Sequence, residues 1–124
     1  MRICVVDASA MGALLFGEPK AEELASILEG ARLAAPALLW FELASVCLKK
    51  IVAHPELDSQ LISALGSLSR LAIDIVHVDH FATVTLARES GLTTYDASYL
   101  WIAINLGGEL ITLDEKLAQA MVSK

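Results

Sequence analysis

The sequence predicts an α/β protein, a three-layer α/β/α sandwich around a central parallel sheet. Two observations lead to this prediction. Short apolar runs recur along the chain, as in strands that are covered on both faces. Segments with helical spacing separate these runs, and strands joined by helices form right-handed crossovers between parallel neighbours. Because 124 residues is the size of one domain with a sizeable core, we expect residues 1–124 to fold as a single unit.

In the first half of the chain, residues 3–6 and 32–35 form the expected strands. Prolines begin several of the helices, because their fixed φ suits the first turn, and glycines end them. The expected helices cover residues 10–16, the segment from Pro19 to the stop at Gly30, the segment from Pro36 to residue 51 or 52, and a segment after Pro55.

The second half repeats this alternation of strands and helices. Aspartates stand at the positions where helix caps are expected, and glycines at the positions where helices end. The expected elements are a strand at 73–78, a helix at 81–90 capped by Asp79 and stopped by Gly91, a helix from Asp96 to the Gly107-Gly108 pair, a strand at 109–113, and a short helix after Asp114.

The helix that begins at Asp96 has an unusual composition. From Tyr99 to Leu106 it is apolar on every side except at Asn105, which predicts a path through the interior. An unpaired carboxylate at the start of a buried helix costs free energy, so its presence needs a reason. Thr93 and Asp96 have the spacing of a capping box, and the helix dipole favours an acid there. A structural cap and a functional acid therefore both explain Asp96.

Three further acids are candidates for a functional site. Asp7 directly follows the first strand and Asp114 follows the last, and open parallel sheets bind ligands at the carboxyl ends of their strands. Glu42 lies on a mostly apolar helical face without a basic residue within one turn. Asp7 also fits a turn, and Asp114 also fits a helix cap. If the sheet gathers these acids with Asp96, they repel one another and a bound cation is the natural remedy.

The chemistry of such a site follows from its ligands. Carboxylates without Cys or His suit hard cations, Mg²⁺ or Mn²⁺, rather than zinc. In phosphodiester hydrolysis such ions activate water and stabilise charge on the leaving oxygen. The net charge of −6 argues against diffuse binding of nucleic acid. However, the metal ions can supply the positive field that a phosphate needs, with Arg and Lys at the rim assisting.

Several features bear on location. No uncharged apolar run approaches the ~18 residues of a membrane span. Asp7 interrupts the N-terminal apolar run, so no signal peptide is expected. Cys4 and Cys47 lie in apolar contexts, which is typical of buried free thiols in a reducing cytosol. We therefore expect a cytoplasmic protein.

Four motifs occur in order along the chain: Val6-Asp7-Ala-Ser9, Phe41-Glu42-Leu-Ala, Tyr95-Asp96-Ala-Ser-Tyr, and Leu110-Ile-Thr112-Leu-Asp114-Glu-Lys-Leu. Through them the chain resembles, over nearly its full length, the PIN-domain ribonucleases, and within these the VapC-like toxins of toxin–antitoxin pairs. The resemblance implies a metal-dependent endoribonuclease with a PIN-like fold. It also implies that Asp7, Glu42, Asp96 and Asp114 hold Mg²⁺ or Mn²⁺, supported by the hydroxyls of Ser9 and Thr112. The family often has Asn three residues after the helical Glu, where this chain has Ser45.

The same resemblance implies partners. These are an RNA substrate, a second copy in a homodimer, and a cognate antitoxin whose tail covers the groove beside the acids, often with a basic side chain among them. The 56% of hydrophobic residues is more than so small a domain buries comfortably, so we expect an exposed apolar patch. Large side chains on the early helices are expected to form it: Met11, Leu14, Leu15, Phe16, Trp40 and Phe41.

Other interpretations of these residues remain open. A haloacid-dehalogenase-like phosphatase also has an Asp after its first strand, but it needs a second Asp where this chain has Ser9. A receiver domain needs paired acids there and a strand-end Lys, whereas Lys116 lies in the last helix. His77 and His80 beside Asp79 suggest a metal site, although strand-end histidines beside a cap are commoner. The aromatic residues, Tyr99 and Trp101 among them, are most simply core or interface residues.

Overall fold

The computed structural model describes residues 1–124 and contains one four-stranded sheet in the order β3-β2-β1-β4. Every neighbouring pair of strands is parallel. The strands are β1 (Ile3–Val6), β2 (Arg32–Ala35), β3 (Ile73–Ile75) and β4 (Glu109–Ile111). The predicted parallel sheet is therefore confirmed.

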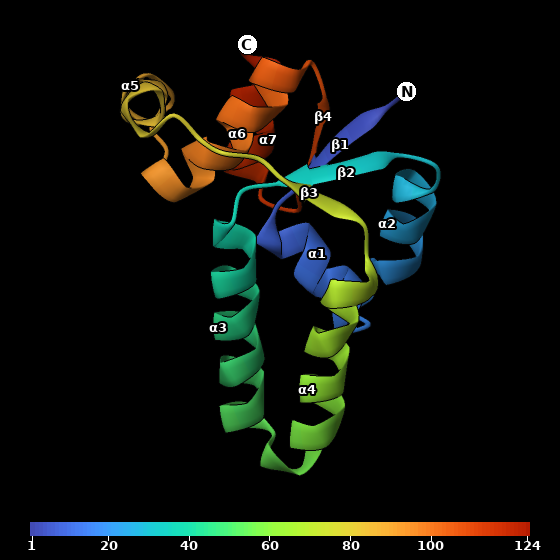
Figure 1. Cartoon of the computed structure of the whole chain (residues 1–124). Coiled ribbons are helices and arrows are strands. Elements are labelled where there is room, and N and C mark those ends of the chain that lie inside the picture. The colour runs from blue at the N-terminus through green and yellow to red at the C-terminus, as the bar shows by residue number, and fades with distance from the viewer.

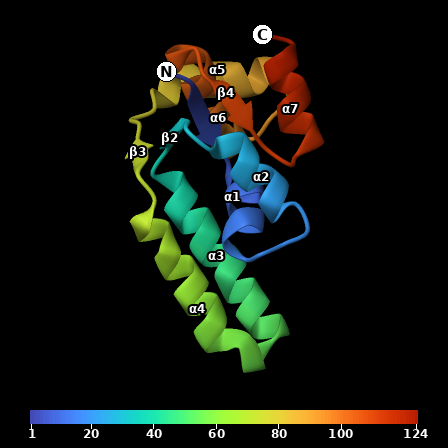
Figure 2. The same ribbon diagram turned by 90° about the vertical axis from the view of Figure 1, so that its right-hand side faces the viewer.

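Seven α-helices surround this sheet: α1 (Ala8–Leu15), α2 (Ala21–Leu28), α3 (Leu38–Ala53), α4 (Asp58–Gly66), α5 (His80–Ser90), α6 (Thr94–Leu106) and α7 (Glu115–Val122). Short 3₁₀ turns at Pro55–Leu57 and Ser67–Arg70 flank α4. Helices α5, α6 and α7 lie on one side of the sheet, while α1, α3 and α4 lie on the other (Figures 1 and 2). This arrangement is the predicted three-layer sandwich. Helices α3 and α4 form a hairpin that projects well beyond the sheet (Figures 1 and 2).

Two strands are shorter than the sequence suggested. β3 ends at Ile75 and β4 at Ile111, so the predicted strands at 73–78 and 109–113 were too long. Pairing ends because the neighbouring strands end: β2, beside β3, ends at Ala35, and β1, beside β4, ends at Val6. The last bond of β3 runs from the Val76 N–H to the Ala35 carbonyl at 2.9 Å, and the last bond of β4 runs from the Asp7 N–H to the Ile111 carbonyl at 3.2 Å.

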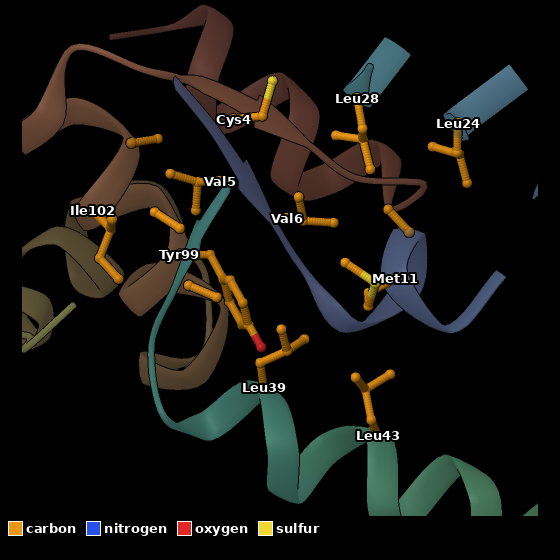
Figure 3. Close-up of a cluster of buried hydrophobic side chains, with 14 of the residues drawn as sticks. Cys4, Val5, Val6, Met11, Leu24, Leu28, Leu39, Leu43, Tyr99 and Ile102 are labelled. Carbon is orange, nitrogen blue, oxygen red and sulfur yellow. The ribbon is translucent and has the colours of Figure 1, made fainter. Parts of the chain in front are cut away.

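The core surrounds β1, whose Cys4, Val5 and Val6 are buried by helices on both faces (Figure 3). Helix α6 packs on β1 as expected from its composition, and its middle turns are buried. The prediction was wrong for its last turn, where Ile104 and Leu106 are 43% and 38% exposed. The neighbouring helices and β1 cover the middle of α6 but leave one side of this turn open.

The two glycines after α6 were predicted to end it, and the structure confirms this. Gly107 has φ +64°, a left-handed conformation that closes the helix at little steric cost. Gly108 passes so close to β1 that a Cβ would lie 3.0 Å from the Ile3 carbonyl oxygen. The absence of a side chain therefore lets β4 begin directly beside β1.

The apolar surface differs from the one expected. Met11 is fully buried between β1 and α3, so its assignment to an exposed patch was wrong. Leu14, Leu15, Phe16 and Trp40 are half-buried, whereas Phe41 is 74% exposed as expected. Other exposed apolar side chains lie on the outer face of α3, on β3, on α5 and at the start of α6: Leu48, Val52, Ile75, Phe81, Val84 and Tyr95. None of the helices is both long and apolar enough to cross a membrane.

Candidate active site

The order of the strands determines where a site can form. From β1 the chain moves outward to β2 and β3, and it then returns to place β4 on the opposite side of β1. The carboxyl ends of β1 and β4 are therefore the point at which the winding reverses, the usual ligand position in such sheets. Asp7 follows β1 directly, and Asp114 follows β4 after two residues. Both acids lie at this edge, as predicted.

Asp7 is buried and held by three hydrogen bonds. It is the N-cap of α1, and its Oδ1 accepts from the Ala10 N–H at 3.0 Å. The Ser9 hydroxyl donates to the same oxygen at 2.7 Å, and the Thr112 hydroxyl donates to Oδ2 at 2.5 Å. The two hydroxyls that the sequence suggested as supports therefore both contact Asp7.

Asp114 is the N-cap of α7, as the structural interpretation of the sequence predicted. Its Oδ1 accepts from the backbone N–H groups of Lys116 and Leu117 at 2.9 and 3.2 Å. Its own N–H donates to the Thr112 hydroxyl at 3.0 Å, which links it to Asp7. The side chain is exposed, and the cap occupies only one of its two oxygens.

Asp96 lies in the first turn of α6 and is not itself the cap. Thr93 is the N-cap, and its Oγ1 accepts from the Asp96 N–H at 3.1 Å. Burial raises the pKa of the Asp96 carboxyl, and the negative charges of Asp114 and Asp7 raise it further. Lys116 and the Thr93 hydroxyl partly oppose this rise. Asp96 is therefore an acid that is hard to ionise, at a helix end that another residue already caps.

Glu42 projects from the second turn of α3 and is half-buried. Burial raises the pKa of its carboxyl, and the charges of Asp96 and Asp7 add to this. The Tyr99 hydroxyl donates to its Oε1 at 2.6 Å and partly counters the rise. No basic side chain pairs with it, because the four ion pairs of the structure all involve other acids. Burying the Glu42 carboxylate without a paired cation costs free energy, as expected from the sequence.

The structure thus gathers the four candidate acids in one region. The Thr112 hydroxyl links Asp7 to Asp114, the charges of Asp7 and Asp114 act on Asp96, and those of Asp7 and Asp96 act on Glu42. The side chains do not form a closed cage. No three His, Cys, Asp or Glu side chains already lie in an arrangement that could hold a metal ion. The region is best described as an acidic cluster at the end of β1 and β4.

The comparisons with known proteins decide the family. Residues 4–121 match the PIN domain. The chain belongs to the PIN domain family. It is similar to Ribonuclease VapC3 of Pyrobaculum aerophilum, with 32% identity over 123 residues covering 93% of this chain and 92% of that protein. Its fold matches the crystal structure of PAE2754 from the same organism, with a TM-score of 0.78 and 24% identity over 96% of this chain and 84% of the other. The resemblance to the PIN domain is therefore confirmed.

The sequence of this PIN-domain chain did not predict one contact of the site. Tyr99 was expected to be a core residue, and it is buried, but its hydroxyl reaches Glu42. Two features of the sequence are consistent with this contact. Tyr99 carries the only hydroxyl of the segment from Tyr99 to Leu106, and it lies one helical turn after Asp96.

The histidines at the start of α5, His77 in the preceding loop and His80 in the first turn, do not contribute to the acidic cluster. The His77 and His80 rings are 6.0 Å apart between centroids, and no metal-binding arrangement includes them. Asp79 caps α5 by accepting from the Ala82 N–H at 3.0 Å, which confirms the structural interpretation of this segment.

Proposed function

We propose that this protein is a metal-dependent endoribonuclease that hydrolyses RNA phosphodiester bonds and acts as the toxin of a toxin–antitoxin pair. The observation that carries the proposal is the gathering of four carboxylates from separate parts of the chain at the point where the sheet reverses its winding. Membership of the PIN domain family and the similarity to a protein named a ribonuclease support it.

The acids fit a divalent cation by their chemistry. Carboxylate oxygens are the ligands preferred by Mg²⁺ and Mn²⁺. Burial and the neighbouring carboxylates raise the pKa of both Glu42 and Asp96, and a bound cation would favour their charged forms. We assign Asp7, Asp96 and Asp114 as ligands, and Glu42 as either a further ligand or the group that orients the attacking water. The acids do not already form a metal-binding arrangement, so binding an ion requires some of their side chains to turn.

When bound, the ion supplies Lewis-acid stabilisation of the phosphate and makes a water molecule easier to deprotonate. The protein supplies orientation. Ser9 and Thr112 fix the carboxylate of Asp7, so that this ligand does not swing away from the others. The raised pKa of Glu42 suits a group that accepts a proton from the attacking water. Lys116, whose charge acts on Asp96, lies near enough to attract the RNA phosphate.

A groove suited to a protein partner begins beside the acids. It has a volume of about 560 Å³ and lies between the start of α3, the end of β3, α5 and the start of α6. Leu38 and Tyr95 line it, and they lie on the same helices as Glu42 and Asp96. We assign the protein partners, a second copy of this chain and an antitoxin, to this apolar surface and to the acidic cluster that adjoins it.

The decisive experiment is cleavage of labelled RNA by the purified protein with Mn²⁺, Mg²⁺ or EDTA. We expect cleavage with Mn²⁺ or Mg²⁺ and none with EDTA. Asp96→Asn keeps the shape of the side chain but removes its charge, so cleavage should fall by orders of magnitude. Full activity of Asp96→Asn would remove this residue from the site.

The phosphatase and receiver alternatives both need Asp7 to attack or accept a phosphoryl group. Neither Ala8 nor Ser9 provides the second acid that the alternatives need after Asp7, and Ser9 instead donates a hydrogen bond to Asp7. This geometry disfavours both alternatives. Incubation with acetyl phosphate, followed by mass measurement of the intact protein, would reveal an aspartyl phosphate if either alternative were correct.

A further inference from the structure

The hydroxyl of Tyr99 is in an unusual position for a core residue. The side chain is only 1% exposed and crosses from α6 to α3, where its oxygen lies close to Leu39 (Figure 3). There it donates to Oε1 of Glu42 at 2.6 Å, between residues 57 apart in sequence. A phenol carries a single O–H, so this bond uses the one donor of the Tyr99 side chain.

Glu42 depends on this bond for its orientation. It forms no ion pair, and the Tyr99 hydroxyl is its only side-chain hydrogen-bond partner. The charges of Asp96 and Asp7 repel its carboxylate. A glutamate has three side-chain torsions, so without a fixed partner this repulsion would turn the carboxylate away from the other acids. The bond to Oε1 also leaves Oε2 of Glu42 for a ligand.

We propose that Tyr99 is a positioning residue that holds Glu42 within the acidic cluster, ready to meet a divalent cation. The inference rests on the proposed function, because it assumes that the cluster binds a metal ion. Tyr99 touches neither the ion nor the RNA in this role. It acts through Glu42, from the opposite layer of the sandwich.

The test is direct binding of Mn²⁺ to the purified protein, measured by isothermal titration calorimetry without RNA. Tyr99→Phe keeps the ring in the core and removes only the hydroxyl. We expect the dissociation constant for Mn²⁺ to rise by about 10- to 100-fold, the usual effect of losing a group that orients a metal ligand. The control is Ser26→Ala, which removes an exposed hydroxyl on α2 that makes no hydrogen bond to the acids. This control should bind Mn²⁺ like the wild type.

A double variant separates positioning from a purely structural role. If Tyr99 acts through Glu42, then Tyr99→Phe should change Mn²⁺ affinity in the wild type but not in a Glu42→Gln background. An equal loss of affinity in both backgrounds would mean a general loosening of the core and would overturn the inference. Far-ultraviolet circular dichroism of each variant confirms that it is folded.

The results distinguish this inference from the proposed function. Wild-type protein that binds no Mn²⁺ would overturn both. If the wild type binds Mn²⁺ and Glu42→Gln weakens that binding, while Tyr99→Phe binds as tightly as the wild type, only the role of Tyr99 is wrong.

Discussion

The Ser9 hydroxyl connects Asp7 to the far end of the chain: it donates to Oδ1 of Asp7 at 2.7 Å and accepts from the Leu113 N–H at 2.9 Å. One side chain therefore joins the first turn of α1 to the loop after β4. Removing it should loosen the geometry of the acidic cluster without removing any acid.

We therefore predict that Ser9→Ala lowers Mn²⁺-dependent RNA cleavage by about 10- to 100-fold while the protein stays folded. The rate of cleavage of labelled RNA at saturating Mn²⁺ is the measurement. Ser26→Ala, which removes an exposed hydroxyl on α2, is the matched control and should leave the rate unchanged. A Ser9→Ala enzyme as fast as the control would show that Asp7 does not need this support.

Stability without metal distinguishes the acids from one another. Glu42→Gln and Asp96→Asn remove charges that are buried and repelled by their neighbours, so each should raise Tm by about 2–5 °C in EDTA. Asp7→Asn should instead lower Tm, because Oδ1 caps α1 while Oδ2 accepts from the Thr112 hydroxyl, and an amide nitrogen can replace neither acceptor. Thermal unfolding in EDTA measures all three. A lower Tm for Asp96→Asn would contradict the mutual repulsion of the acids.

The pH dependence of stability follows from the same two carboxyls. Their ordinary pKa values are 3.8 for Asp96 and 4.5 for Glu42, and folding raises both. Above these values the folded protein holds more protons than the unfolded chain, so the free energy of unfolding contributed by the two groups falls as pH rises. This contribution is complete below about pH 4 and is lost as pH rises through the raised pKa values.

We therefore predict that the metal-free wild type loses stability relative to Asp96→Asn as pH rises from about 4 toward 7. Urea unfolding at several pH values in EDTA gives the difference between the two proteins. Mn²⁺ should reverse the trend for the wild type, because the ion binds the ionised acids. A difference that does not change with pH would contradict the raised pKa of Asp96.

Lys116 provides a test of substrate attraction. Its charge acts on Asp96, although the chain as a whole is acidic. Lys116→Gln should raise the KM for RNA several-fold at low salt, with a smaller effect on kcat and a smaller difference at high salt. Lys49→Gln removes the same charge from the exposed side of α3 and serves as the control. If the two changes raise KM equally, Lys116 contributes only to the net charge of the protein, and its position beside Asp96 has no special effect.

We also predict a homodimer in solution, formed through the groove between β3, α5 and α6. Ile75 and Val84 are 62% and 58% exposed beside this groove, which is costly for large apolar side chains in a monomer. Light scattering at about 50 µM should give twice the mass of the chain, and Val84→Glu should halve it. Val122→Glu alters an exposed valine on α7, outside the groove, and should leave the mass unchanged. A wild-type monomer at this concentration would rule the homodimer out.

Much of the fold and of the site could be predicted because it depends on local rules. The apolar runs, the caps at Asp79 and Asp114 and the glycine stops are short-range signals, and the structure contains all of them. The position of Asp7 followed from one topological rule about the ends of parallel strands. What these rules could not give are distances between parts of the chain that are far apart in sequence.

The contact between Tyr99 and Glu42 is the clearest example, because it depends on how α3 and α6 approach the end of β1 from opposite layers. The length of β3 depended on where its neighbour ends, and a single strand carries no signal for that. The burial of Met11 depended on the fit of α1 between β1 and α3. Helical spacing assigns a face to a residue but does not say which neighbour covers that face.

The strand order has a consequence for synthesis on the ribosome. β1 is made first, and it can pair with β2 once residue 35 has left the exit tunnel, but its other edge waits for β4 at residues 109–111. Thr112 is made 105 residues after Asp7, followed by Asp114, and until then Asp7 lacks its partner from that loop. A nascent or prematurely terminated chain therefore lacks a complete acidic cluster.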